Sequence, residues 1–488
     1  MVGHRTLPAI LSERDQSSRS AVVCAETGTA LSYAELAQIA TDLRESFQRH
    51  GLRARDRVAL LLPNSIEFAA AFFGALAAEA VVMPLDIHLK RADLLRIIDK
   101  TGPRILVTNP SLYRKIGSDL RQTTICLLEF DEPLSVGFLD AGNTANDAGR
   151  HGPCLPEDDA VLILSSGSTG LPKAVRLSHR AILHNISMHW ESLAIEEDIR
   201  GLQLLPMNFS YGLIASFLSI LHAGGTAVLL AAPEPKSVWD AMDQYDVNLV
   251  MGTPALFQFV IENSRATSVS PVRYVTVGGD RCKRYALELL CERLPAAKVF
   301  LTYGLTEAGP RVSTLPHHLV KQYPDSVGLP LRGVKVFIRD GEIVVRTPSL
   351  MTGYWGEPER TGRVVRDSLL HTGDLGYLDK RGLLYCLGRK DRQFKFGGRL
   401  VNPNVIEQCL ASHPLVREAA VEKVENDRAE WLCARVKAGD AGEEELLPEL
   451  KRFCRQHMPS YLVPAEFRFE DRDHYYYKGR RWKFAETI

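Results

Sequence analysis

The chain has 488 residues, 59 basic and 59 acidic side chains, and 45% hydrophobic residues. A single ordinary core does not reach this length, so we expect two or more domains. The balanced charge gives no sign of a nucleic-acid partner, and no apolar run is long enough to cross a membrane, so we expect no membrane partner either.

The nine cysteines and the first residues of the chain bear on its compartment. The cysteines are an odd number without a Cys-x-x-Cys spacing, which favours reduced thiols over disulfides or a metal cluster. Arg5, Glu13, Arg14 and Asp15 surround a short apolar patch, which makes a poor signal peptide. We therefore expect a cytoplasmic protein.

The early elements alternate between strand and helix. Residues 56–62 predict a buried strand that stops at Pro63, residues 65–80 a helix, and residues 81–84 the next strand. The alternation continues from about residue 30 to 390 and is typical of layered α/β structure. The sequence after about residue 390 is more charged, and it predicts a smaller region of α+β structure.

A glycine- and hydroxyl-rich loop follows a predicted strand at residues 161–164. Its residues are Ser165, Ser166, Gly167, Ser168, Thr169, Gly170, Leu171, Pro172 and Lys173. Glycines let backbone N–H groups face an anion, hydroxyls donate hydrogen bonds, and lysine adds positive charge, which together predict a phosphate cradle. Leu171 and Pro172 separate the last glycine from the lysine, so the loop is no Walker A motif. A solvated Gly/Ser linker is the alternative.

Several further motifs occur along the chain in an order and at a spacing that are typical of one family. They lie at residues 31–36, 174–179, 206–213, 303–308, 371–375 and 388–391. Together with the loop, this set resembles the adenylate-forming superfamily, which includes acyl-CoA synthetases, stand-alone nonribosomal-peptide adenylation enzymes, aryl-acid activating enzymes and luciferases. The resemblance covers nearly the whole chain. One departure is Glu79, because the family has glycine at this helix end; we expect the turn to be built differently.

The resemblance implies an α/β fold in two parts. A large N-terminal domain of packed sheets and helices, residues 1–390, would hold ATP and the acid. A small, mobile α+β lid, residues 391–488, would pivot at Asp391. The implied reaction is ATP-dependent attack of a carboxylate on the α-phosphate, which forms an acyl-AMP and releases pyrophosphate, followed by acyl transfer to a thiol or an amine.

The resemblance also implies an ATP and Mg²⁺ site, because two anionic reactants need charge neutralisation. Tyr303 would stack on adenine, Thr306 would bind the α-phosphate, and Glu307 would hold Mg²⁺, which prefers oxygen ligands. Asp374 would accept both ribose hydroxyls, and Arg389 would also reach the ribose. The alternatives are a simple turn around Glu307 and a hairpin turn at Asp374, the latter compatible with ribose binding. The full set of predicted ATP contacts is Ser165, Ser166, Gly167, Ser168, Thr169, Gly170, Lys173, Gly279, Tyr303, Gly304, Thr306, Asp374 and Arg389.

The lid departs from the family near its end. Residues 395–403 resemble the acyl-CoA synthetase form of the segment that enters the site for transfer. Counted from Pro464, the final Gly-Lys of the family falls on Gly479 and Arg480. Arginine keeps the charge but is a larger planar fork. Three interpretations follow. Arg480 takes the place of the lysine directly, Lys478 takes it with the register shifted by one, or the adenylation step is weakened. We favour the interpretation that one of the lid cations acts in adenylation. The predicted catalytic residues are Arg480, Lys478, Thr306 and Glu307.

The predicted acyl pocket combines Phe209, Ser210, Tyr211, Ile214, Gly278 and Arg311. Enzymes of the family that activate α-amino acids place an aspartate where this chain has Ser210. An ammonium buried without a carboxylate is costly, so we expect an aryl or other small non-amino acid. Arg311 has two interpretations: it meets a second anionic group on the substrate, or it braces the loop through a surface salt bridge.

The acceptor remains open between coenzyme A, the phosphopantetheine of a carrier protein and a small amine, each supplied in trans. A different class is also compatible with Arg480: a degenerate member that binds ATP or an acyl-adenylate without turnover.

Overall fold

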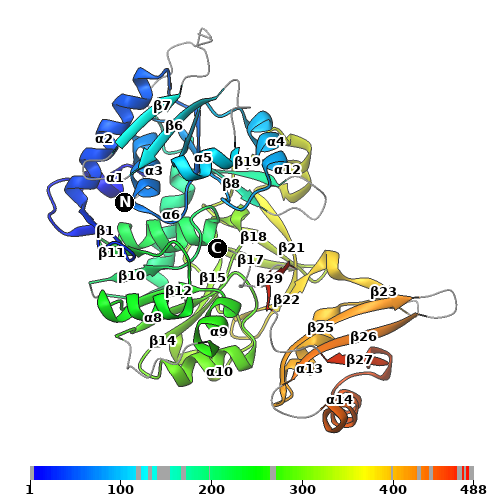
Figure 1. Cartoon of the computed structure of the whole chain (residues 1–488). Coiled ribbons are helices and arrows are strands. Elements are labelled where there is room, and N and C mark those ends of the chain that lie inside the picture. The colour runs from blue at the N-terminus through cyan, green and yellow to red at the C-terminus, as the bar shows by residue number, and fades with distance from the viewer. Residues whose placement is uncertain are drawn as a thin grey trace.

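The computed structural model describes residues 5–116, 123–129, 135–139, 154–165, 172–196, 198–263, 271–396, 399–425, 430–438, 443–469, 475–477 and 480–482, with the backbone alone at 443–445, 475–477 and 480–482. The architecture is mixed α/β, as predicted, with two large sheets, a third smaller sheet and a separate C-terminal body (Figure 1).

The larger sheet has nine strands within the described residues, and six of them run parallel. In sheet order they are β16 (Leu329–Pro330), β15 (Ser313–Leu315), β14 (Lys298–Tyr303), β13 (Tyr274–Val277), β12 (Leu249–Gly252), β10 (Arg200–Gln203), β11 (Thr226–Leu229), β1 (Ser20–Cys24) and β2 (Ala30–Ser32). The strands from β14 to β1 are the parallel ones, and β2, β15 and β16 pair antiparallel at the edges.

The second large sheet has eight strands among the described ranges. In order they are β19 (Gly353–Tyr354), β9 (Lys173–Ser178), β8 (Asp159–Ser165), β4 (Val81–Pro84), β3 (Arg57–Leu61), β5 (Ile105–Thr108), β6 (Thr124–Glu129) and β7 (Ser135–Leu139). Strands β3, β4 and β8 confirm the three strands predicted at residues 56–62, 81–84 and 161–164. They are buried on both faces, which explains their continuous apolar sequences.

Helices lie between and outside the two sheets, so the large part of the chain is layered. The core between the sheets includes side chains of α1 (Ala9–Ser12), α2 (Tyr33–Arg49), α3 (Ile66–Ala77), α6 (His179–Leu193), η1 (Tyr211–Leu218) and α7 (Ser219–His222). A second core joins the outer face of the larger sheet to α8 (Pro235–Gln244), α9 (Pro254–Glu262), α10 (Arg284–Arg293) and α11 (His317–Val320). A third joins the other sheet to α4 (Arg91–Thr101) and α5 (Pro110–Ile116).

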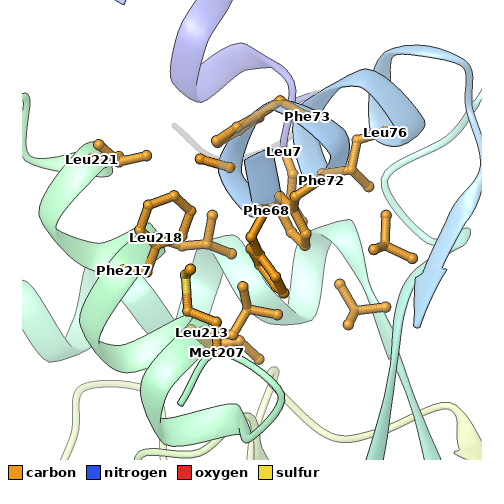
Figure 2. Close-up of a cluster of buried hydrophobic side chains, with 14 of the residues drawn as sticks. Leu7, Phe68, Phe72, Phe73, Leu76, Met207, Leu213, Phe217, Leu218 and Leu221 are labelled. Atoms are coloured by element: carbon orange, nitrogen blue, oxygen red, sulfur yellow. The ribbon is translucent and has the colours of Figure 1, made fainter. Parts of the chain in front are cut away.

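The centre of the core is the contact between α3 and η1 (Figure 2). Phe68, Phe72 and Phe73 of α3 are at most 1% exposed. The ring of Phe73 lies 6.4 Å from that of Phe217 on η1. Helix α3 is apolar around most of its surface because it lies between two sheets, and only its first turn carries a charged residue, Glu67.

The third sheet continues toward the C-terminal body. It contains β17 (Lys335–Arg339), β18 (Glu342–Arg346), β20 (Val365–Arg366), β21 (Leu369–Leu378) and β22 (Leu384–Arg389), and α12 (Pro358–Val364) lies beside it. The next elements are η3 (Lys390–Arg392) and the short hairpin β23 (Phe394–Phe396) and β24 (Arg399–Val401).

The C-terminal body has its own hydrophobic core, as a separate folding unit would. It contains α13 (Pro403–Ala411), β25 (Val416–Glu425), β26 (Glu430–Ala438), α14 (Glu443–His457), η4 (Ser460–Leu462) and β27 (Glu466–Phe469). A final hairpin, β28 (Tyr475–Tyr477) and β29 (Arg480–Trp482), lies against α9 of the large part. The boundary at residue 390 stays a prediction.

The turn after α3 corrects one expectation. Glu79 adopts the left-handed conformation itself, with φ at 60°, so the chain keeps the conformation that glycine would take. Its carbonyl accepts a hydrogen bond from the N–H of Arg55 at 2.8 Å, which ties the turn to the start of β3. No helix among the described residues is both long and apolar enough to span a membrane.

His179, the first residue of α6, makes the fold sensitive to acid. Its Nδ1 accepts a hydrogen bond from the Leu7 N–H at 3.1 Å, and its Nε2 lies 3.3 Å from Cys154 Sγ. The side chain is 2% exposed, and burial lowers its pKa from 6.5 to about 4. The unfolded chain therefore binds more protons than the folded one between these values, so stability falls as pH drops through this window.

We predict that His179→Asn reduces the loss of unfolding free energy between pH 7 and pH 4 by about 3 kcal/mol. The asparagine oxygen can still accept from Leu7, but the new side chain does not titrate. Urea denaturation of both proteins at several pH values measures the difference. His88→Asn, at an exposed position, controls for the loss of a histidine. Parallel pH profiles for wild type and His179→Asn would contradict the assignment.

Candidate active site

The predicted site residues gather where strands end. Ser165 is the last residue of β8, Tyr303 is the last residue of β14, and Gly278 and Gly279 follow β13. The carboxyl ends of parallel strands are where open α/β sheets hold ligands. The predicted strand at residues 299–301 is confirmed within β14, and it brings Tyr303 to this edge.

A hydrogen-bonded group forms around Asp374. Asp374 on β21 and Arg389 on β22 are register partners, and Arg389 Nη1 lies 3.4 Å from Asp374 Oδ1. The Tyr303 hydroxyl donates to Asp374 Oδ2 at 2.7 Å. Burial raises the pKa of Asp374 above its ordinary value, and the contacts with Tyr303 and Arg389 offset part of this rise. The hairpin-turn alternative for Asp374 is wrong, because the residue lies inside a strand.

Glu307 and Lys173 form a second charged group. The Tyr354 hydroxyl donates to Glu307 Oε1 at 2.8 Å. Lys173 Nζ lies 5.4 Å from the centre of the Tyr354 ring, and the Arg360 guanidinium lies 5.8 Å from it. Burial lowers the pKa of Lys173, the charge of Arg360 lowers it further, and Glu307 acts in the opposite direction. Two cations and one carboxylate therefore surround a single tyrosine.

This group suits a phosphate-bound metal ion. Mg²⁺ is usually held by one or two protein carboxylates together with substrate phosphates. The described residues contain no cluster of three or more His, Cys, Asp or Glu side chains that could hold a metal alone. Glu307, which is anchored through one oxygen, fits the role of a single protein ligand. Ser166, Gly167, Ser168, Thr169 and Gly170 lie outside the described residues.

The predicted acyl side meets the predicted phosphate side at two hydroxyls. Ser210 Oγ lies 2.8 Å from Thr306 Oγ1, and the Ser210 side chain is nearly buried. The next residue, Tyr211, begins η1, a π-helix, which is a conformation often found at functional sites. The Tyr211 hydroxyl donates to the carbonyls of Gly252 and Thr276.

Glycines make room for this arrangement. A Cβ on Gly278 would lie 2.3 Å from Thr302 Oγ1, and one on Gly304 would lie 1.8 Å from the carbonyl oxygen of Pro310. Phe209 ends the turn before η1, and its N–H donates to Pro206. Ile214 packs fully buried in the core between the sheets, and its contact with substrate stays a prediction.

Arg311 corrects another expectation. The side chain is 2% exposed, and in the described part of the chain no carboxylate pairs with it, so the surface salt bridge is wrong. Its guanidinium lies 3.9 Å from the centre of the Tyr211 ring, and Nη1 donates to the Pro310 carbonyl at 3.3 Å. Arg311 is thus a buried side chain that packs against Tyr211 of the predicted acyl side.

Comparison with known proteins decides the family. Residues 12–355 match the AMP-binding enzyme family, and residues 405–473 match the AMP-binding enzyme C-terminal domain. The chain belongs to the AMP-binding enzyme family.

Individual relatives are similar along the whole chain. A feruloyl-CoA synthase from an Amycolatopsis species is 30% identical over 484 residues, which cover 94% of each protein. A 2-succinylbenzoate–CoA ligase from Geobacillus kaustophilus is 28% identical and covers 96% of this chain and 94% of the relative. The o-succinylbenzoate CoA synthetase of Bacillus subtilis, solved with an acyl-adenylate intermediate, superposes with a TM-score of 0.80 at 25% identity and covers 96% and 95% of the two chains.

In this AMP-binding enzyme a cleft of about 1020 Å³ separates the large part from the C-terminal body. Asp280, Arg281 and Arg389 line one wall, and Asn404 and Glu407 line the other. Next to Arg389, a Cβ on Gly388 would lie 1.7 Å from Asn404 Nδ2, so glycine is required for this close approach.

The connection and the end of the lid of the AMP-binding enzyme are only partly described. Asp391 lies in η3, and its Oδ1 is 3.4 Å from Arg389 Nε; its role as hinge stays a prediction. Lys478 and Gly479 lie outside the described residues. Arg480 is described as backbone, as the register partner of Tyr477.

Sequence reasoning did not find Tyr354, Arg360 or His189, a third site residue considered below. No local pattern marks them, because Tyr354 joins the site through Glu307 and His189 through Arg311, each more than 40 positions away, and Arg360 joins it through Tyr354.

We predict that Asp374→Asn raises the KM for ATP by about 10- to 100-fold, because hydrogen bonds to a charged acceptor are worth about 1.5–3 kcal/mol. The decisive measurement compares ATP with 2′-deoxy- and 3′-deoxy-ATP. Wild type should discriminate by about tenfold for each missing hydroxyl, and the variant should discriminate much less. Asp240→Asn, at an exposed ion pair on α8, is the control. Equal discrimination in wild type and Asp374→Asn would contradict a ribose contact.

Proposed function

We propose that this protein is an AMP-forming ligase that uses ATP and Mg²⁺ to convert a small carboxylic acid into an acyl-adenylate, and then transfers the acyl group to coenzyme A. The observation that carries the proposal is the 2.8 Å contact between Ser210 and Thr306. It supports the proposal because the residue predicted to contact the acid lies beside the residue predicted to contact the α-phosphate, and the two reactants must meet.

The chemistry requires two anions to approach each other. A carboxylate oxygen of the acid forms a bond to the α-phosphorus, and the bond from that phosphorus to the pyrophosphate oxygen breaks. Lys173 and Arg360 neutralise the leaving pyrophosphate end, and Asp374 and Arg389 fix the ribose. Glu307 would hold Mg²⁺, which would supply further charge neutralisation.

Coenzyme A is the proposed acceptor because the relatives compared above are named as CoA synthases or ligases. The segment at residues 395–403 also resembles the CoA synthetase form. In the second step the thiol sulfur attacks the acyl carbon, and AMP leaves.

The acid is proposed to be an aryl or other small acid without an α-ammonium group. Ser210 provides no negative charge for an ammonium, and the buried charge on the acyl side belongs to Arg311, which is positive. A cationic substrate would therefore meet repulsion as well as a desolvation cost.

The cytoplasm is the proposed location. All nine cysteines are free of disulfides, which suits a reducing compartment where ATP and coenzyme A are present.

Acid-dependent ATP–pyrophosphate exchange tests the proposed function. We expect exchange with at least one acid of a panel of aryl and aliphatic carboxylic acids, and acyl-CoA formation once coenzyme A is added. A carrier protein and small amines serve as comparison acceptors. Measurable ATP binding with no exchange for any acid would instead indicate a degenerate, nucleotide-binding member.

The lid cation has a separate test. We predict that Lys478→Ala and Arg480→Ala differ sharply in exchange rate, because only one of the two can bridge the carboxylate and the α-phosphate. Lys483→Ala serves as the matched control from the same segment. Exchange close to wild type in all three variants would show that no cation from this segment acts in adenylation.

A further inference from the structure

A buried arginine and a buried histidine lie together beside the acyl residues without hydrogen-bond partners for most of their polar atoms. Among the described residues, Nε and Nη2 of Arg311 have no partner, and neither ring nitrogen of His189 has one. Arg311 is 2% exposed and His189 is 0% exposed. His189 lies one turn after Asn185 on α6, and the Asn185 side chain is hydrogen-bonded to the backbone of Arg311. Burial lowers the pKa of His189, and the charge of Arg311 lowers it further.

Such a pair is unfavourable in the free protein. A charge that is buried without a counter-ion is strongly destabilising, and buried arginines are therefore usually paired. The contact with the Tyr211 ring offsets only part of this cost, because the attraction between a cation and an aromatic face is weaker than the penalty of burying an unpaired charge. A ligand that supplies the missing negative charge would restore the balance.

Helix α6 holds the pair in place. Asn185 and His189 are four residues apart and lie on the same face of the helix. Asn185 Nδ2 donates to the carbonyls of Ala308 and Arg311, and Asn185 Oδ1 accepts from the Arg311 N–H. The backbone that carries Arg311 is thus clamped against the turn that precedes His189.

The two free nitrogens of Arg311 form one recognition edge. Nε and Nη2 lie on the same side of a guanidinium, where their N–H groups point in parallel and match the two oxygens of a carboxylate. Nη1, on the other edge, is already used by Pro310. The face of the group is covered by Tyr211, whose neighbour Ser210 contacts Thr306. The unpartnered edge therefore belongs to a side chain that packs against the residues of the predicted acyl side.

We propose that Arg311 is a specificity-determining residue that binds a second carboxylate on the acid, with His189 as an additional donor, so that the preferred substrate is a dicarboxylic acid of which only one carboxyl group is activated. This inference rests on the proposed function. A neutral substituent would leave the charge uncompensated, and a cationic one would be repelled.

The test measures discrimination between matched acids. Each dicarboxylic acid of an aryl and aliphatic panel is paired with its monoamide, which has the same shape but no second charge. We expect the wild type to favour the dicarboxylic acid by on the order of 100-fold in kcat/KM for ATP–pyrophosphate exchange. Arg311→Met should bring this ratio close to one, and Arg311→Lys should give an intermediate ratio because lysine lacks the fork.

Arg332→Met is the matched control, because Arg332 is an exposed arginine that pairs with Glu191 on the same helix α6. It should keep the wild-type ratio. His189→Asn, which removes the second donor, should lower the ratio less than Arg311→Met does.

Thermal unfolding separates this inference from the proposed function. The best dicarboxylic acid should raise the Tm of wild type and leave that of Arg311→Met unchanged, whether or not exchange occurs. The ligand-free Arg311→Met protein should unfold at the wild-type temperature or above it, because the variant removes an unpaired buried charge. A purely structural arginine would instead lower the Tm when replaced.

Exchange with no acid at all would overturn the proposed function, and the thermal shift would then decide this inference. Preference of the wild type for monoamides or monocarboxylic acids would overturn the inference while leaving the proposed function intact. An unchanged ratio in Arg311→Met, or an equal thermal shift in both proteins, would overturn it as well.

Discussion

The packing of α3 against η1 between the two large sheets is the constraint on which the rest of the structure depends. Both helices are buried, and Phe73 of α3 contacts Phe217 of η1 between the sheets. Because this interior is closely packed, a shift of either sheet would open a cavity there. Because η1 begins at Tyr211, the same packing fixes the position of this residue of the predicted acyl side. A hydrophobic contact thus sets the position of polar groups at the strand ends.

The candidate site contains several separate positive charges, and these differ in whether a carboxylate lies close to them. Arg389 has Asp374 and Asp391 as partners, and Lys173 lies near Glu307. Arg311 has no carboxylate partner within the described ranges. A protein that brings two anions together needs such positive charges. A cation without a carboxylate partner gains more from binding an anionic ligand than a cation that is already paired.

The sequence was informative where chemistry is local and weak where it depends on distant contacts. Apolar runs predicted β3, β4, β8 and β14, because strands in a doubly covered sheet need no alternation. The motif containing Asp374 was found, but its pairing with Arg389 required the register of two strands. The burial of Arg311 could not be predicted, because it depends on α6, more than 100 residues earlier.

The hairpin that carries Asp374 and Arg389 also leads into the C-terminal body. Arg389 is the last residue of β22, and η3 follows it directly. Its guanidinium faces Asp374, while its backbone begins the connection to the rest of the chain. A torsional change in this connection would therefore begin beside Asp374, and Gly388 next to it lets Asn404 approach closely. Because the C-terminal body is attached through this connection, a small rotation at the end of β22 would displace that whole body relative to the predicted ribose contact.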